Sequence, residues 1–220
     1  MKFNDSGYRY MDDLALKFGT DKASNFHNYT EIYSQHFESI KDDPIKFLEI
    51  GIYQGSSVKL WEEYFKNAEL HFIDISMEGV KYHSKRSHYH IAHQEDPKEL
   101  RQFIQQSGGN FDVIIDDGGH TMHQQTVSFL CLFPHVKSQG VYIIEDLHTS
   151  YWPCLGGGNH SQTTIALLKN LIDKLNYVGA NTTRASHNDL SKSVTDTLDI
   201  YQKEIRSICF YDSLVFITKR

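Results

Sequence analysis

The chain has 220 residues, 40% hydrophobic and 23% charged, which suits one globular domain with a full hydrophobic core. Its formal net charge of −6 gives no electrostatic reason to expect a nucleic-acid partner, because such partners are bound by surfaces rich in Lys and Arg. The sequence shows no signal core, no run near the roughly 18 to 20 apolar residues that span a bilayer, and no C-x-x-C pair, so we expect a cytoplasmic protein without a membrane partner.

Apolar runs alternate with amphipathic segments over residues 45–176, which predicts strand–helix units in series. Strands are expected at residues 45–51, 70–75, 89–92, 111–116 and 140–145, and helices at residues 57–66, 78–86, 97–106, 121–133 and 161–176. Asp96 precedes Pro97 and is expected to cap the helix that begins there, with a contact to the adenine edge of a cofactor as the alternative. Repeated units of this kind predict a parallel sheet with helices on both faces.

The end of the chain departs from this pattern. Two apolar runs, residues 205–210 and 214–218, are separated by three residues, and so short a connection forces an antiparallel hairpin, because a parallel crossover needs a dozen or more. We therefore expect an α/β fold whose sheet is mostly parallel and seven-stranded, with an antiparallel last strand. Residues 154–160 and 180–195 are polar or Gly-rich and are expected to form mobile loops.

The turn after the first strand bears on the cofactor. Gly51 and Gly55 lie four residues apart, which is not the G-x-G-x-x-G pattern that admits a pyrophosphate, so a nicotinamide dinucleotide is disfavoured. Asp74, at the end of the second strand, is placed to accept hydrogen bonds from ribose hydroxyls, with a helix or turn cap as the alternative. Gln94 follows the third strand, where the adenine edge is usually read.

Acidic clusters follow the fourth and fifth expected strands. Residues 116–120 read Asp-Asp-Gly-Gly-His, and Glu145 and Asp146 end the other strand. Because ligands bind at the carboxyl ends of such strands and Mg²⁺ prefers oxygen donors, Asp117, Glu145 and Asp146 are expected to hold a magnesium ion beside two substrate hydroxyls. His120 is placed to remove a hydroxyl proton as a general base. In the alternative interpretation, residues 116–120 form only a turn, and Glu145 and Asp146 are only the solvated end of a strand.

These motifs, taken together, resemble those of a known family. They are residues 116–120, Ile-Glu-Asp-Leu-His-Thr-Ser-Tyr-Trp-Pro at 144–153, Phe-Gly-Thr-Asp-Lys at 18–22, His-Asn-Tyr-Thr at 27–30 and Phe-Tyr-Asp-Ser-Leu at 210–214. From about residue 12 onward the chain resembles the metal-dependent sugar O-methyltransferases of the macrolide and tetracenomycin type. The resemblance implies a Rossmann-like class I methyltransferase fold, S-adenosylmethionine and Mg²⁺ as cofactors, a homo-oligomer, and a sugar hydroxyl of a glycosylated natural product or polysaccharide precursor as acceptor.

The resemblance also implies roles for individual residues. It makes Asp117, Glu145 and Asp146 the magnesium ligands and His120 the base, in agreement with their spacing. The residues implied for the cofactor are Thr20, Lys22, Tyr29, Glu49, Gly51, Gly55, Ser57, Asp74, Gln94 and Asp116, the last facing either the cofactor or the turn. Residues 1–44 are expected to form a helical lid or cap on a core of residues 45–220, within one domain of residues 1–220.

Other functions stay open on the sequence alone. Some members of the family carry an additional N-terminal domain that helps assembly and substrate recognition; we expect none here, so the acceptor cannot be copied from them. A catechol-type O-methyltransferase acting on an aromatic diol is one alternative, since it uses comparable metal chemistry. A Rossmann-like oxidoreductase or cofactor-binding module is another, with the acidic residues serving only solubility.

Overall fold

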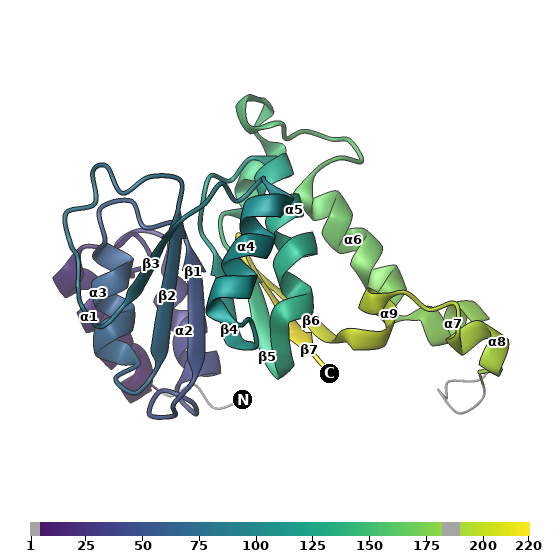
Figure 1. Ribbon diagram of the computed structural model, residues 1–220, viewed down its shortest axis with the longest axis horizontal. Coiled ribbons are helices and arrows are strands. Elements are labelled where there is room, and N and C mark those ends of the chain that lie inside the picture. Colours follow the sequence, from purple (N-terminus) through teal and green to yellow (C-terminus); the bar gives the residue numbers. More distant parts are fainter. Residues whose placement is uncertain (1–4, 182–189) are drawn as a thin grey trace.

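A seven-stranded sheet forms the centre of the computed structural model, which describes residues 5–181 and 190–220 (Figure 1). Its order is β3-β2-β1-β4-β5-β7-β6. The strands are β1 (Lys46–Ile50), β2 (Glu69–Asp74), β3 (His88–Ile91), β4 (Phe111–Asp116), β5 (Val136–Ile144), β6 (Ile205–Tyr211) and β7 (Leu214–Lys219). The first five pair in parallel, whereas β7 is antiparallel to both β5 and β6. The expected sheet with an antiparallel last strand is confirmed.

Helices cover both faces of the sheet (Figure 1). One face packs against α1 (Asp5–Phe18), α2 (Tyr29–Phe37) and α3 (Ser56–Tyr64), and the other against α4 (Pro97–Ser107), α5 (Met122–Leu132) and α6 (Thr164–Leu175). Neighbouring residues of one strand enter opposite cores: Phe47 contributes to the first and Leu48 to the second. Burial on both faces explains why the strands are continuous apolar runs. Asp96 caps α4 as expected, accepting a hydrogen bond from the backbone N–H of Lys98 at 2.7 Å.

The helix expected at residues 78–86 is wrong, because this segment is a loop. Several of its polar groups bond to distant parts of the chain. The Arg86 guanidinium donates to the Glu62 carbonyl at 2.8 Å and to that of Phe65, and the Lys81 backbone N–H donates to the Gln54 carbonyl at 3.2 Å. These contacts hold the segment against the rest of the chain without a helix.

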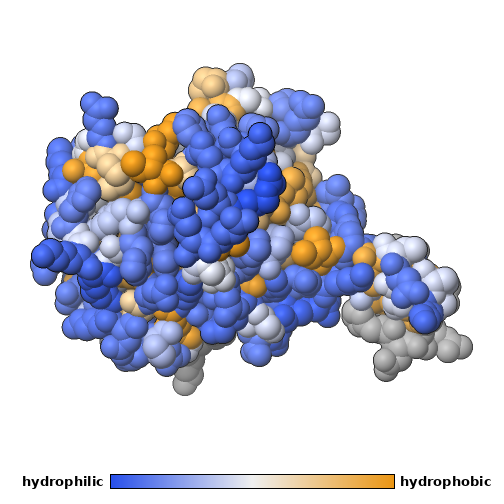
Figure 2. Space-filling view, viewed as in Figure 1, coloured by the Kyte–Doolittle hydropathy of each residue, from blue (hydrophilic) through white to orange (hydrophobic). Residues whose placement is uncertain are grey.

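Short helices fill the connection after α6. They are α7 (Tyr177–Asn181), α8 (Lys192–Thr195) and α9 (Ile200–Glu204), and the first two lie on an arm that projects from the body (Figures 1 and 2). Of the loop expected at residues 180–195, residues 182–189 lie outside the described residues. The Gly-rich loop expected at residues 154–160 begins in the 3₁₀ helix Pro153–Leu155, which follows another at Leu147–Tyr151, and continues as turns and bends. The Gly158 N–H donates to the Ser150 carbonyl at 2.8 Å. Across the described ranges, no helix combines the length and apolar character needed to cross a membrane.

The link between α1 and α2 is fixed by one buried carboxylate, that of Asp12. It accepts hydrogen bonds from the Ser24 backbone N–H at 2.7 Å, from the Ser24 hydroxyl at 2.6 Å and from the Thr30 hydroxyl at 2.8 Å. These hydrogen bonds hold residues 19–28 in place between the two helices. We call residues 5–44, which include both helices, the N-terminal cap. In this segment Lys22 lies at the carboxyl ends of β4 and β5, where it contacts Asp117 and Glu145.

Candidate active site at the carboxyl edge of the sheet

The turns after β1 and β4 touch at Gly51. Its φ of +100° lies in the left-handed region, and a Cβ at this position would overlap the carbonyl group of Asp117. The Asp117 N–H donates to the Ile50 carbonyl at 2.9 Å, so the two turns are bonded as well as packed. Glycine is therefore required for the acidic turn to lie beside the end of β1.

A cavity of about 430 Å³ opens beside these turns, lined among others by Gly51, Asp74, Gln94, Asp117 and Gly118. Asp74 accepts hydrogen bonds from the backbone N–H groups of Ile52 at 2.8 Å and Tyr53 at 3.2 Å, so it holds the turn while it lines the cavity. The Gln94 amide is fixed too, because its carbonyl accepts from the Gly119 N–H at 2.6 Å. The structure thus shows Asp74 capping the turn, which was the alternative role. Its contact with ribose hydroxyls stays a prediction.

A second cavity of about 460 Å³ shares Gly51, Tyr53, Gln54, Asp117 and Gly118 with the first. Thr20, Ser57 and His120 line its other walls. The two cavities adjoin at these shared residues and together extend from the end of β2 past the glycine turn to the acidic cluster, and we call the two together the hollow. Such a hollow at the carboxyl edge of an open α/β sheet is where ligands of this architecture bind.

Glu49 lies beneath the turn and is fully buried. Its carboxylate accepts hydrogen bonds from the Ser57 hydroxyl at 2.8 Å and from the Trp61 indole at 3.0 Å. Burial raises its pKa to about 7, against the lowering effect of Lys22. The contacts make Glu49 an anchor for the start of α3, while Gly55, with φ of +88°, caps that helix.

The Lys22 ammonium group occupies the centre of the acidic cluster. It contacts both Glu145 carboxylate oxygens at 2.9 Å, the Asp117 carboxylate, and Glu49 at 3.5 Å, and its side chain is fully buried. Burial by itself would lower the pKa of Lys22, but the surrounding carboxylates raise it well above its ordinary value. The lysine is therefore a permanent cation among three carboxylates.

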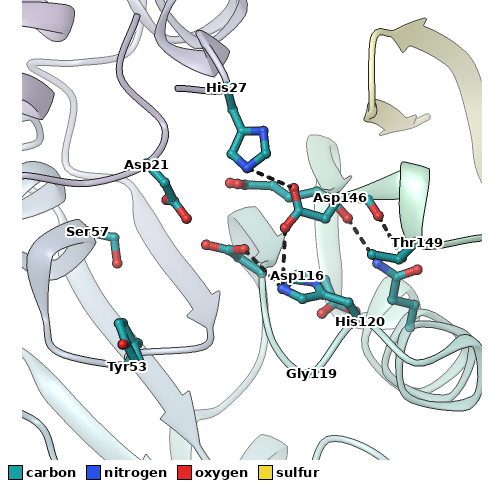
Figure 3. A network of polar contacts seen from close by, with 12 residues as sticks. Asp21, His27, Tyr53, Ser57, Asp116, Gly119, His120, Asp146 and Thr149 are labelled. Carbon is teal, nitrogen blue, oxygen red and sulfur yellow. Dashed lines mark hydrogen bonds and ion pairs between the residues drawn. The ribbon is translucent and has the colours of Figure 1, made fainter. Parts of the chain in front are cut away.

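Asp146 is held from both sides at the rim of the site. Figure 3 shows His27 and His120 on opposite sides of its carboxylate, with Nε2–O distances of 3.7 Å and 3.4 Å. The Tyr29 hydroxyl donates to the same carboxylate at 2.8 Å. Asp146 and His120 both have positive φ, +57° and +58°, a strained backbone that the surrounding contacts maintain and that is typical of functional sites.

Asp117 belongs to two groups of closely spaced ligand atoms. In one, its carboxylate lies with His120 and Asp146; in the other it lies with Glu49 and Glu145 around Lys22. Glu145 turns away from Asp146 toward Lys22 and the hydroxyl of Tyr33. The structure thus brings the three predicted metal ligands to one edge, with Asp117 between the other two.

Several residues predicted to face the cofactor are placed elsewhere. Asp116 is fully buried, where it accepts hydrogen bonds from the Gln94 amide at 3.0 Å and from the Ser128 hydroxyl. Lys22 and Tyr29 contact the acidic cluster instead of the two cavities. Their side chains point this way because a buried carboxylate must find a donor or a cation. Burial raises the pKa of Asp116 to about 6.

Two residues of the cap that contact the acidic cluster, His27 and Tyr33, were not predicted as site residues from the sequence. Tyr33 donates to Glu145, and His27, which stacks on Tyr29 with ring centroids 4.8 Å apart, contacts Asp146. Their positions in the sequence could have indicated both residues. His27 lies in the same His-Asn-Tyr-Thr run as Tyr29, and Tyr33 lies one helical turn after Tyr29.

Comparison with known proteins identifies this architecture. A family described as "Methyltransferase domain" matches residues 48–147. The chain is 36% identical over 179 residues to L-olivosyl-oleandolide 3-O-methyltransferase of Streptomyces antibioticus, covering 76% of this chain and 46% of that protein. It is 32% identical to 8-demethyl-8-alpha-L-rhamnosyl tetracenomycin-C 2'-O-methyltransferase of Streptomyces olivaceus, covering 94% and 54%. The chain thus spans about half the length of the curated relatives it matches.

The structural comparison agrees with the sequence comparison. The MycE methyltransferase from the mycinamycin biosynthetic pathway, in complex with Mg and SAH, superposes with a TM-score of 0.82 at 29% identity, covering 95% of this chain and 54% of that one. Another structure of that enzyme contains Mg, SAH and mycinamycin VI. This chain therefore belongs to the methyltransferases of the class I fold, and its curated homologues are sugar O-methyltransferases of macrolide and tetracenomycin pathways.

Proposed function

We propose that this chain transfers a methyl group from S-adenosylmethionine to a sugar hydroxyl of a glycosylated natural product or a polysaccharide precursor. The observation that carries the proposal is the position of His120, beside the Asp117 and Asp146 carboxylates and on the wall of the hollow that Gly51 borders. A base, a set of oxygen donors and a nucleoside-sized hollow meet there. The names of the matched relatives support a sugar acceptor.

The hollow formed by the two adjoining cavities is the proposed S-adenosylmethionine site. Asp74 and Gln94 line the part near β2 and β3, which suits a nucleoside, and Thr20 and Ser57 line the part near the acidic cluster. Gly51 borders both parts, and a side chain at this position would overlap the Asp117 carbonyl group. Lys22, Tyr29, Glu49 and Asp116 act behind this surface by fixing the turns and the acidic residues.

The donors at this edge fit a magnesium ion. Asp117, Glu145 and Asp146 offer carboxylate oxygens, which Mg²⁺ prefers, and the cluster already holds one cation, the Lys22 ammonium group. These three residues are therefore the proposed ligands. The bound ion would polarise the acceptor hydroxyl and make its proton easier to remove.

His120 is proposed to accept that proton at Nε2. The imidazolium ion that results is stabilised by Asp146 Oδ2 at 3.4 Å and Asp117 Oδ1 at 3.9 Å. The hydroxyl oxygen forms a bond to the methyl carbon as the carbon–sulfur bond breaks, so the products are a methyl ether and S-adenosylhomocysteine. A positioned general base contributes about 10²-fold to 10⁴-fold in rate.

Exposed aromatic residues and free cysteines bear on the oligomeric state and the cellular location of the protein, and we propose a cytoplasmic homo-oligomer. Tyr151 and Trp152 are exposed aromatic side chains, a feature of surfaces that bind a partner, and we propose that they contact a second copy in a homo-oligomer. The cysteines at positions 131, 154 and 209 are free, which suits the reducing cytoplasm.

Calorimetry with S-adenosylhomocysteine, with and without Mg²⁺, tests the assignment. Asp117→Ala should abolish the effect of Mg²⁺, whereas His120→Ala should retain both ligands and lose about 10²-fold to 10⁴-fold in turnover. Asp173→Ala, an exposed carboxylate on α6, is the matched control. Turnover on a panel of glycosides and catechols separates the sugar acceptor from an aromatic diol. Full metal-dependent activity in Asp117→Ala would show that the site is misassigned.

A further inference from the structure

Four potential metal-binding side chains lie on one face of the sheet where β2 pairs with β3. Glu69 and His71 belong to β2, and His88 and His90 to β3. In the parallel register His71 is paired with His88, and His90 lies two residues further along β3. Because side chains of a strand alternate between faces, all four point the same way. None of them belongs to the acidic cluster.

Their ligand atoms are already close together. One carboxylate oxygen of Glu69 and one ring nitrogen each of His71 and His88 lie within 4.8 Å of one another. The Glu69 Oε1 and His71 Nε2 atoms are 2.7 Å apart, and the His71 and His88 rings stack with centroids 4.8 Å apart. Tetrahedral zinc bonds of about 2.0–2.2 Å place ligand atoms about 3.3 Å from each other. The exposed His88 and half-exposed Glu69 can close this difference by rotating.

The central ligand is held rigidly. His71 is 4% exposed, and its ring packs against Phe111 on β4 and Phe103 on α4. In the structure His71 Nε2 donates to Glu69, and its Nδ1 atom lies 3.1 Å from His90 Nε2. A metal ion at Nε2 would replace that proton, and the ring proton would then sit on Nδ1 and be donated to His90 Nε2. A hydrogen bond to the remote nitrogen of a ligating histidine is the usual way in which its orientation is fixed. Burial lowers the pKa of His71, which keeps its imidazole neutral.

A nearby cation, Lys46, competes for the same carboxylate. Its ammonium group lies 3.4 Å from Glu69 Oε1, but it also donates to the Ser107 carbonyl and lies 5.2 Å from the Phe111 ring centroid. Lys46 therefore keeps partners when Glu69 turns to a metal ion. The competition weakens binding without blocking the three ligand positions.

We propose that Glu69, His71 and His88 form a second metal site, selective for zinc-type ions, in which His90 positions His71. Two imidazoles and one carboxylate favour Zn²⁺ or Co²⁺ over Mg²⁺, which prefers oxygen donors. Three protein ligands leave one position for water. The bound ion would tie the edge strand β3 to β2, and β3 leads directly into Gln94 on the wall of the hollow.

Cobalt binding, followed by visible absorption on the full chain, tests this site. The acidic cluster also offers ligand atoms to Co²⁺, so the comparison is between wild type and His88→Ala. His88→Ala should bind one equivalent fewer, or bind at least tenfold more weakly at this site. His83→Ala, an exposed histidine of the preceding loop that stacks on Tyr89, is the matched control and should bind as wild type does. Asp117→Ala should retain the equivalent that His88→Ala loses.

Competition and a second variant complete the design. Zn²⁺ should displace this Co²⁺ equivalent, whereas a large excess of Mg²⁺ should not. Glu69→Gln, at a half-exposed position, should weaken Co²⁺ binding while circular dichroism shows an intact fold. Equal Co²⁺ stoichiometry and affinity in wild type and His88→Ala would overturn the proposal.

Discussion

Replacing Lys22 by methionine removes the ammonium group that three carboxylates share, those of the buried Glu49 and Glu145 and of the partly exposed Asp117. Glu49 and Glu145 are 0% and 2% exposed, and Lys22 contacts them at 3.5 Å and 2.9 Å. Removing one partner of a buried ion pair costs about 3 to 5 kcal/mol, because the remaining charge is neither solvated nor neutralised. For a chain of this size each kcal/mol lowers Tm by about 2 to 4 °C, so we expect a decrease of about 6 to 20 °C.

The measurement is thermal and urea unfolding of both proteins in EDTA and then in Mg²⁺. Lys17→Met, an exposed lysine of α1, is the matched control and should change little. Mg²⁺ should stabilise Lys22→Met more than wild type, since a divalent ion can neutralise the carboxylates that have lost their lysine. A loss below about 1 kcal/mol in EDTA would refute the view that Lys22 is the counter-charge of the cluster.

Two further variants test the turn and the cap. Gly51→Ala should destabilise the fold by about 2 to 5 kcal/mol and abolish S-adenosylhomocysteine binding, because the added Cβ overlaps the Asp117 carbonyl and also strains a left-handed backbone. Gly79→Ala, at a positive φ but with no atoms near the added Cβ, should cost only about 1 to 2 kcal/mol. Equal losses of stability in urea unfolding would contradict this expectation. Burial lowers the pKa of His36, which stacks on Phe216, so the unfolded chain binds a proton more readily and stability should fall as pH drops below about 6.5. His36→Phe should flatten this dependence between pH 7.5 and 5.5, and an unchanged slope would count against it.

Much of the fold follows from short-range patterns. The strand at Phe111–Asp116, the C-terminal hairpin and the Asp96 cap depend on residues a few positions apart, and all three were predicted. The loop at residues 78–86 was not, because its conformation depends on carbonyl groups of Glu62 and Phe65 about twenty residues away. β5 also begins earlier than expected, at Val136, where it pairs with Phe111 across a register shift.

The candidate site was predictable only in part, for a related reason. The edge that gathers Asp117, Glu145 and Asp146 follows from the order of the strands, and the sequence placed them there. Which donors would meet those carboxylates depends on how the cap lies over the edge. Lys22 was therefore assigned to a cofactor, although it contacts Asp117 and Glu145.

The contacts between the cap and the acidic cluster also determine when the site can form. Lys22, Tyr29 and Tyr33 contact Asp117, Glu145 and Asp146 across sequence separations of 95 to 123 residues. During synthesis from the N-terminus, the cap must wait until β5 has been made, and closing such long loops slows folding. The polar residues of the cap are thus synthesised well before the carboxylates that they contact, and they find these partners only late in folding.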